Sequence, residues 1–199
     1  MIHTFKPTPD NQVDQYAYQT PIEGLLYIEH KRFDDNRGFY AELDRVPEIE
    51  KALDIDFKVK QINLSHSKPN VIRGIHAENW NKLLMITRGT IFAAWVDFRK
   101  ESATFGEVVT MTVGDHNETA LFGSVFVSAG IGNSFCVTDG PVDYLYAVDQ
   151  LYAERDPSGD VAISVFDPEL AIPWPITKEH LVISDRDLQA VSFKEKFSL

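Results

Sequence analysis

The stretch LLMITRGTIFAAWVDF, residues 83–98, indicates the fold class most directly. Its two apolar runs, 83–87 and 90–98, are rich in aliphatic, aromatic and β-branched residues, and the Arg88-Gly89 step between them predicts a tight hairpin. Similar short runs recur on both sides, among them 24–28, 57–65, 71–76, 108–113, 134–137 and 142–152. Many short strands at this spacing predict an all-β sandwich or barrel.

Helices are expected at only two places. One covers 47–53, with Pro47 in its first turn. The other begins after Ser184, which would act as N-cap with Asp187 in the first turn. There is no βαβ alternation and no internal repeat, which argues against a doubly wound nucleotide-binding fold. We therefore expect one domain over 1–199, with a polar arm at 1–22 and a helical tail at 176–199.

The composition disfavours several classes of protein. The 199 residues contain 19 Lys and Arg against 30 Asp and Glu, a formal net charge of −11. A chain this acidic is a poor non-specific ligand for nucleic acid or anionic membranes, so neither is an expected partner. No segment reaches the roughly 18 apolar residues of a membrane helix. A single cysteine, Cys136, suits a reducing compartment, and we expect a cytoplasmic protein.

Polar residues alternate with apolar ones in the predicted strand 59–65. Gln61, Asn63 and Ser65 share one face, while Ile62 and Leu64 share the other. Two amides and a hydroxyl in a row form a neutral hydrogen-bonding surface. This surface is either a solvated outer face or the wall of a polar pocket, and parity alone leaves both interpretations open.

The segment RGIHAENWNK, residues 73–82, concentrates several chemically useful side chains. Arg73 and His76 would point to opposite faces of a straight strand, but a bulge at Gly74 would bring them to one side. Each residue also has a simpler explanation: a lone His is commonly structural, Trp80 suits the edge of a core, and Lys82 could lie along the surface. The functional interpretations are a base, a ring that stacks on a planar ligand, and a cation at a pocket.

Known cofactor motifs are not found. His76 is followed by Ala77 and Glu78, so there is no His-x-His pair, and the other histidines have no ligand spacing with it. We expect no metal site. The sequence also contains no P-loop, no Gly-x-Gly-x-x-Gly and no Gly-x-Ser-x-Gly.

Several segments, in order, resemble the dTDP-4-dehydrorhamnose 3,5-epimerases. The resemblance extends over about 24–190 and is carried by FDDNRGFYAE (33–42), QINLSHSKPNVIRGIHAE (61–78), VDFRKESATFG (96–106), DPELAIPWP (167–175) and SDRD (184–187). It implies a cupin-type jelly-roll fold with a few short helices. It also implies a homodimer, to whose partner subunit the N-terminal arm contributes.

The resemblance implies roles for individual residues. His76 corresponds to the catalytic base, Asp187 to the carboxylate that orients it, Tyr146 to the acid on the opposite face of the sugar, and Lys82 to the cation near the reacting carbonyl oxygen. Seven further positions correspond to residues that hold the nucleotide, its phosphates or the sugar: Arg37, Glu42, Gln61, Asn63, Arg73, Asp160 and Arg186. Trp80 would stack on the base, and Asn133 is a further substrate-binding position.

These roles form a consistent chemistry. In a dTDP-4-keto-6-deoxy sugar the C3 and C5 protons both flank the C4 ketone, so a histidine can remove each one to give an enolate. A carboxylate would fix the tautomer of that histidine, a lysine would stabilise the enolate oxygen, and a tyrosine on the other face would return the proton. The ketone is already in the substrate, so we expect no cofactor.

Simpler interpretations remain for single residues. Tyr146 could be a core aromatic, Asp187 could complement a helix N-terminus, and Arg37 could be a surface charge at a turn; their joint occurrence in family order favours the functional set. The alternative functions are a single-carbon epimerase, a related isomerase that moves the keto group, and a non-catalytic sugar-nucleotide-binding cupin.

Two positions depart from the pattern of many family members. Asn133-Ser134-Phe135 stands where many have His-Gly-Phe, and Ala93 stands where many have Asp. The loop after His76 is also short. These departures bear on whether one carbon or both are inverted.

Overall fold

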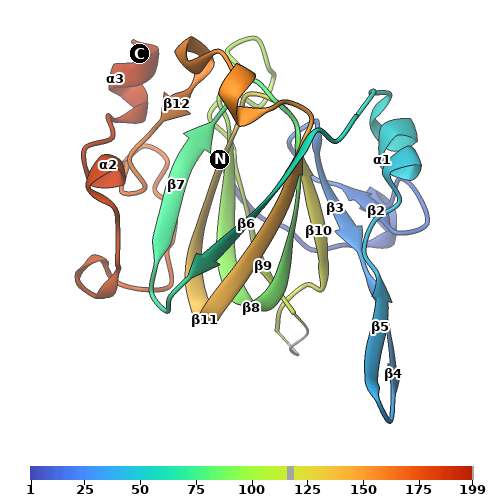
Figure 1. The fold of residues 1–199 in the computed structure, drawn as a ribbon. Helices are drawn as coiled ribbons and strands as arrows, with labels where there is room; N and C mark the ends of the chain where they lie inside the picture. Colours follow the sequence, from blue (N-terminus) through green and yellow to red (C-terminus); the bar gives the residue numbers. More distant parts are fainter. Residues whose placement is uncertain (116–118, 199) are drawn as a thin grey trace.

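The computed structural model describes residues 1–115 and 119–198, and its main elements are β-strands (Figure 1). The strands are β1 (Ile2–Thr4), β2 (Ala17–Gln19), β3 (Leu25–Glu29), β4 (Lys31–Asp35), β5 (Gly38–Glu42), β6 (Gln61–Ser67), β7 (Ile72–Ala77), β8 (Lys82–Asp97), β9 (Val108–Gly114), β10 (Gly123–Val127), β11 (Ile131–Val148) and β12 (Val161–Ala162). The α-helices are α1 (Val46–Leu53), α2 (Asp185–Leu188) and α3 (Phe193–Phe197). Four short 3-10 turns complete the order: η1 (Pro9–Asn11), η2 (Tyr152–Glu154), η3 (Pro157–Gly159) and η4 (Lys178–His180).

Two long strands, β8 and β11, organise the barrel because they pair with each other along most of their length. One half of this pair continues into β10, β3 and β2 on one side and β6 on the other. The other half continues into β9 and β1 on one side and β7 and β12 on the other. The predicted cupin-type jelly-roll fold is therefore confirmed.

The hairpin predicted at Arg88-Gly89 is wrong. β8 runs through this step as one strand, with Gly89 at φ +80°. A Cβ atom at Gly89 would lie 2.6 Å from the carbonyl oxygen of Pro141 on β11, so only glycine fits this close approach. A sharp bend and a tight turn both favour glycine, which is why the local sequence did not distinguish them. The expected strands 134–137 and 142–152 are likewise parts of one bent strand, β11, which ends at Val148.

The core fills the space between the two halves of the barrel. Its largest fully buried side chains include Tyr27, Leu84, Trp95 and Met111, from β3, β8 and β9. Ala93, one of the two departures noted above, lies in this apolar core and is 1% exposed. This apolar core borders the polar cavity described below, since Phe135 and Tyr144 belong to both.

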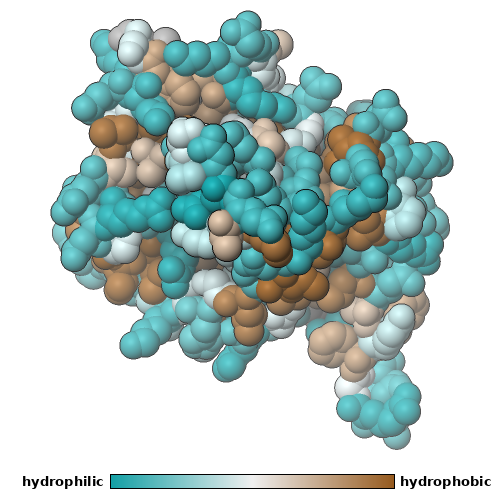
Figure 2. Space-filling view, turned by 45° about the horizontal axis from the view of Figure 1, so that its top comes forward, coloured by the Kyte–Doolittle hydropathy of each residue, from teal (hydrophilic) through white to brown (hydrophobic). Residues whose placement is uncertain are grey.

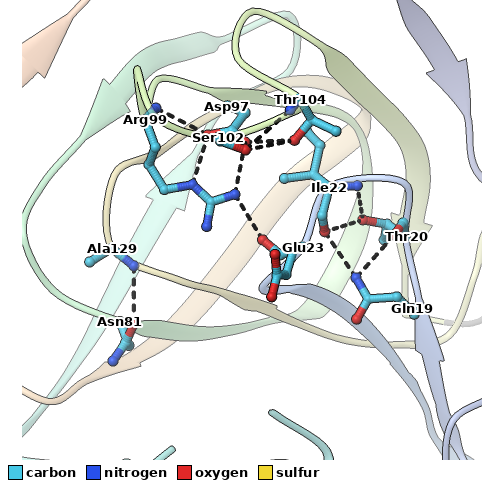
Figure 3. Close-up of polar contacts among 10 residues, drawn as sticks. All are labelled: Gln19, Thr20, Ile22, Glu23, Asn81, Asp97, Arg99, Ser102, Thr104 and Ala129. Atoms are coloured by element: carbon cyan, nitrogen blue, oxygen red, sulfur yellow. Dashed lines mark hydrogen bonds and ion pairs between the residues drawn. The ribbon is translucent and has the colours of Figure 1, made fainter. Parts of the chain in front are cut away.

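The N-terminal segment expected as an arm contributes two strands to the sheet: β1 pairs with β9 and β2 with β3. Its end is tied to the turn after β8, where the Arg99 guanidinium donates to the Glu23 carbonyl at 2.9 Å and to the buried carboxylate of Asp97 (Figure 3). Ser102 and Thr104 also donate to Asp97. A buried carboxylate with this many donors stabilises the turn and the segment beside it.

Two of the three α-helices lie where they were predicted. α1 begins at Val46, next to Pro47, and Ile49 packs on the outer side of the sheet. α2 follows Ser184, whose Oγ accepts a hydrogen bond from the Asp187 amide at 3.1 Å. α3 lies inside the helical tail expected at 176–199, but the sequence did not mark it as a separate helix, because its five residues depend on tertiary packing of Phe193 and Phe197 against Phe98 and Phe105. No helix among the described residues is long and apolar enough to cross a membrane.

The β4–β5 hairpin projects away from the barrel (Figure 1). Its two ends are anchored to β10, since Ser124 Oγ lies 2.8 Å from both Asp44 Oδ2 and His30 Nε2. Its apolar side chains are exposed, with Phe33 57% and Tyr40 65% accessible. In the space-filling view apolar surface separates the hydrophilic hairpin tip from the body of the molecule (Figure 2).

Candidate active site

A cavity of about 310 Å³ opens into the barrel between β6, β7, β8 and β11, with α2 at its edge. Eight of the thirteen predicted site residues line it: Arg73, His76, Trp80, Lys82, Asn133, Tyr146, Arg186 and Asp187. Five do not: Arg37, Glu42, Gln61, Asn63 and Asp160. Segments from the middle and the end of the chain therefore meet around one space.

His76 and Asp187 form the central contact of the cavity. The imidazole Nε2 lies 2.7 Å from Asp187 Oδ1, although 111 residues separate the two in sequence. The carboxylate is held in the first turn of α2, and its side chain is only 6% exposed, against 26% for the imidazole. An ionised carboxylate at Nε2 fixes the proton there and leaves Nδ1 as the basic nitrogen.

Gly74 explains how Arg73 and His76 reach the same cavity. Its φ is +125°, and the pairing of β7 with β11 shifts register at this point. A Cβ atom on Gly74 would lie 2.3 Å from Ser134 Cβ, so no other residue fits without a backbone shift. The predicted bulge is confirmed. Arg73 Nε donates to Ser67 Oγ at 3.0 Å.

Tyr146 faces the cavity from β11 and is half-buried. Burial raises the pKa of its phenol above the ordinary value, and the negative charge of Glu78 raises it further. A raised pKa keeps the phenol protonated at neutral pH. Tyr146 is therefore available as a hydrogen-bond donor or acid, although it also packs against the apolar core.

Asn133 and Tyr144 form a second polar contact in the cavity. Asn133 is the direct register partner of His76 across the β7–β11 pair. Its amide lies within hydrogen-bond distance of the Tyr144 hydroxyl, at 3.1 Å from Nδ2. Tyr144 stacks on Phe135 with 4.8 Å between ring centroids, and burial raises its phenol pKa. The departure at Asn133 therefore keeps a hydrogen-bonding group beside His76.

Lys82 reaches the cavity at the start of β8, where its ammonium forms an ion pair with Glu78. The Lys82 side chain is 9% exposed and that of Glu78 is 20% exposed. Lys82 is thus a cation placed inside a pocket and not a residue that lies along the surface.

The polar row of β6 faces inward, which favours the pocket-wall interpretation. Ile62 and Leu64, on the other face, are 65% and 64% exposed. Ser65 lines the cavity, and Asn63 continues the row beyond it. Gln61 Nε2 donates to Asn63 Oδ1 at 2.6 Å, so the amides are already ordered.

Two neighbouring aromatic rings, those of Trp80 and Tyr152, line the cavity. The Trp80 ring is 6% exposed and lies 6.3 Å from the Tyr152 ring, and its indole N–H has no hydrogen-bond partner among the residues that the structure describes. Arg155 stacks on Tyr152 at 3.9 Å and donates to Asp160 Oδ2 at 3.1 Å. Asp160 is therefore not part of the lining; it binds Arg155, which stacks on the lining residue Tyr152.

Arg37 and Glu42 are placed on the projecting hairpin, away from this cavity. The Arg37 side chain is 85% exposed and pairs with Asp35 at 2.6 Å. Glu42 pairs with Arg45 and borders a separate cavity of about 150 Å³ at the base of the hairpin. Within one chain these two residues do not reach the other predicted site residues.

Sequence reasoning did not assign several residues that the structure places in the lining: Ser65, Glu78, Phe135, Tyr144, Tyr152 and Ser184. Glu78 had a usable signal, because it precedes Lys82 by four residues across a short loop. Tyr144 had another, because it shares a strand face with Tyr146. Tyr152 had no such signal, since it lies in the 3-10 turn η2.

Within 1–115 and 119–198, no group of three or more His, Cys, Asp and Glu side chains is arranged to hold an ion. Four of the ionisable side chains in the cavity instead form two contacts, His76–Asp187 and Glu78–Lys82.

Comparison with known proteins gives the family. The family model described as dTDP-4-dehydrorhamnose 3,5-epimerase matches residues 19–195. The chain belongs to the dTDP-4-dehydrorhamnose 3,5-epimerase family. The family resemblance of the sequence motifs is thereby confirmed.

Individual relatives of the epimerase family are similar over nearly their whole length. The chain is 30% identical to the dTDP-4-dehydrorhamnose 3,5-epimerase of Escherichia coli, over 91% of this chain and 96% of that one. It is 31% identical to a dTDP-4-dehydrorhamnose 3-epimerase of Streptomyces niveus, over 87% and 82%. The structure of the Legionella pneumophila 3,5-epimerase in complex with dTDP-4-keto-L-rhamnose matches with a TM-score of 0.77 and 30% identity, over 88% and 91%.

Proposed function

We propose that the protein inverts C3 and C5 of dTDP-4-keto-6-deoxy-D-glucose to give dTDP-4-keto-L-rhamnose. The observation that carries the proposal is the placement of His76, hydrogen-bonded to Asp187, in one cavity with Tyr146 and Lys82. These four groups supply a base, its carboxylate partner, an acid and a cation. The family relatives act on sugars of this class.

The reaction follows from the acidity of the two carbons beside the ketone. His76 Nδ1 would take the proton from C3 or C5, and the electron pair would move to the C4 oxygen to form an enolate. The imidazolium formed is stabilised by the Asp187 carboxylate, and the enolate oxygen by the Lys82 ammonium. Tyr146 would then give its proton to the carbon from the opposite face, which inverts the centre.

Substrate binding would use the charges and rings around the base. The chain is acidic overall, so two phosphates need individually placed cations, and Arg73 and Arg186 in the lining can supply them. Trp80 and Tyr152 offer aromatic faces for the thymine base. Because the ketone belongs to the substrate, the proposed steps need no redox cofactor and no metal.

We also propose that the enzyme is a cytoplasmic homodimer. The β6 face with Ile62 and Leu64 is apolar and exposed, and the hairpin carries exposed Phe33 and Tyr40. An association that covers these surfaces would place the hairpin against a second copy. In such a dimer Arg37 and Glu42 would reach the cavity of the partner subunit. The N-terminal segment 1–22 would contribute to the contact between the subunits.

A single-carbon epimerase is the second candidate. The Streptomyces niveus relative is a 3-epimerase at an identity similar to that of the 3,5-epimerases, and Asn133 replaces the usual histidine beside the base. A non-catalytic sugar-nucleotide-binding protein is a third, weaker candidate, because such a protein has no need for the His76–Asp187 pair.

Solvent exchange in D2O tests the proposal and separates the candidates. The substrate is dTDP-4-keto-6-deoxy-D-glucose, and NMR follows each carbon. We expect deuterium at both C3 and C5 with inversion at both. Label at one carbon would identify the single-carbon epimerase, and nucleotide binding without any exchange would identify the binding protein.

A further inference from the structure

The ion pair between Glu78 and Lys82 is the part of the cavity to which neither the sequence motifs nor the proposed steps give a complete role. Both side chains line the cavity, and the residues are four apart in sequence. Lys82 is nearly buried, so its ammonium has lost most of its water. A buried ammonium is costly unless a carboxylate or other hydrogen-bond acceptor replaces that water.

The backbone that carries Glu78 is held firmly in place. Residues 78–81 join β7 to β8, and Asn81 fixes this loop from both sides. Its backbone N–H and side-chain amide donate to the Asp149 carboxylate at 3.0 and 2.7 Å. Its Oδ1 accepts from the Ala129 amide at 3.0 Å, the contact drawn in Figure 3. The Glu78 carbonyl also accepts from Gly130. The short loop therefore presents the Glu78 carboxylate at a defined point.

Lys82 needs such a fixed partner. A lysine side chain has four rotatable bonds, and an ammonium without a partner would occupy several positions in a cavity of about 310 Å³. Stabilisation of an enolate is most effective when the positive group is already in position before the charge develops. The Glu78 contact restricts the ammonium to one region of the cavity.

We propose that Glu78 is a positioning residue that acts through Lys82: its carboxylate holds the ammonium where the enolate oxygen forms. This inference rests on the proposed epimerase function. It assigns to the carboxylate no contact with the reacting carbon and no proton transfer.

A second effect of Glu78 supports the same assignment. Its negative charge adds to burial in raising the pKa of Tyr146, so it also favours the protonated acid. The ammonium of Lys82, which is paired with Glu78, offsets most of the negative charge of that carboxylate at the place where the enolate forms. A pair of this kind keeps the phenol neutral without opposing the anionic intermediate.

A double-mutant cycle separates positioning from other roles. Glu78→Gln is made alone and together with Lys82→Met, and Glu101→Gln, at an exposed position, is the matched control. Exchange at C3 and C5 in D2O gives kcat and KM for each variant, because NMR resolves slow turnover over hours. Thermal melting checks that each variant folds.

We expect Glu78→Gln to lower kcat about tenfold or more with KM within threefold, and to cost less than twofold when Lys82 is already Met. The alkaline limb of the pH profile of kcat for Glu78→Gln should move to lower pH, because the negative charge of Glu78 helps to raise the pKa of Tyr146. An equal cost in both backgrounds, or an effect on KM alone, would overturn the inference, since either result means that Glu78 does not act through Lys82.

Glu78→Asp keeps the charge but withdraws the carboxylate by one methylene group, so it covers the case in which Glu78→Gln misfolds. We expect a lower kcat with an unchanged melting temperature, and an unchanged kcat would contradict positioning. A wild-type protein that exchanges neither carbon would overturn the proposed function itself. An active wild type with equal costs in both backgrounds would overturn only the assignment of Glu78.

Discussion

Replacement of Asp187 by Asn tests the contact on which the proposed base depends. The substitution preserves size and keeps the α2 turn, because the Asp187 backbone N–H still donates to Ser184. It removes the negative charge 2.7 Å from His76 Nε2 and permits the amide to donate to that nitrogen, which would favour the other tautomer.

The magnitude follows from the geometry. A hydrogen bond to a charged group contributes about 1.5–3 kcal/mol, and the carboxylate is 6% exposed, so solvent screens it little. At about 1.4 kcal/mol per factor of ten, loss of this stabilisation in the transition state lowers kcat by about 10- to 150-fold. The tautomer change would add to this loss.

The assay measures the rate of exchange at C3 and C5 at saturating substrate, with Asp185→Asn as the matched control. Asp185 lies on the same short helix but is exposed. We expect the control to stay within twofold of wild type, and both variants to melt within a few degrees of it. If Asp187→Asn also stays within threefold, or if the control loses as much activity, the carboxylate does not support the base.

Four further predictions follow from single features of the structure. Tyr146→Phe should lower inversion by about 10²–10⁴-fold, because it removes the proposed acid; inversion within threefold of wild type in a coupled assay would exclude that role. Gly74→Ala should lower the free energy of unfolding by at least about 1–3 kcal/mol in urea titrations, because Gly74 has a φ of +125° and the added Cβ would lie 2.3 Å from Ser134 Cβ. An unchanged urea midpoint of unfolding would show that the bulge tolerates a side chain. Leu64→Glu should convert the proposed dimer to monomers in light scattering while Val182→Glu, also exposed, should not; a dimer in both would place the interface elsewhere. Burial raises the pKa of Cys136 to about 11, so the thiol of the folded protein should react with a maleimide only on unfolding. The free energy of unfolding should also fall above about pH 9, because the thiol ionises there in the unfolded chain but stays protonated in the folded one. Rapid labelling of the folded protein would contradict this.

The fold class was predictable because the local signals agreed with one another. Short β-branched runs, scarce helix signals and ordered family motifs all indicated a jelly roll. The hairpin at Arg88-Gly89 was wrong because a glycine at a bend and a glycine at a turn look alike in one strand. The partner strand β11, which distinguishes them, lies about fifty residues away. The bounds of α3 within the expected helical tail could not be predicted, because its stability comes from packing of Phe193 and Phe197 on other aromatics.

The candidate site was predictable by motif and not by geometry. Nothing local indicates that His76 meets Asp187, because 111 residues of chain separate them and only the path of β7 and the C-terminal segment brings them together. The inward direction of the β6 polar row also required the structure, since strand parity gives two faces but not which one is inside. Arg37 and Glu42 lie on a hairpin that leaves the barrel, so within one chain they do not reach the cavity.

The most direct measurement is a crystal structure of the protein with dTDP-4-keto-L-rhamnose or dTDP-D-glucose in the cavity. The account predicts the His76 imidazole on one face of the sugar and the Tyr146 hydroxyl on the opposite face, each within hydrogen-bond reach of C3 or C5, with Lys82 beside the C4 oxygen. A sugar bound with both groups on the same face, or bound outside this cavity, would contradict it.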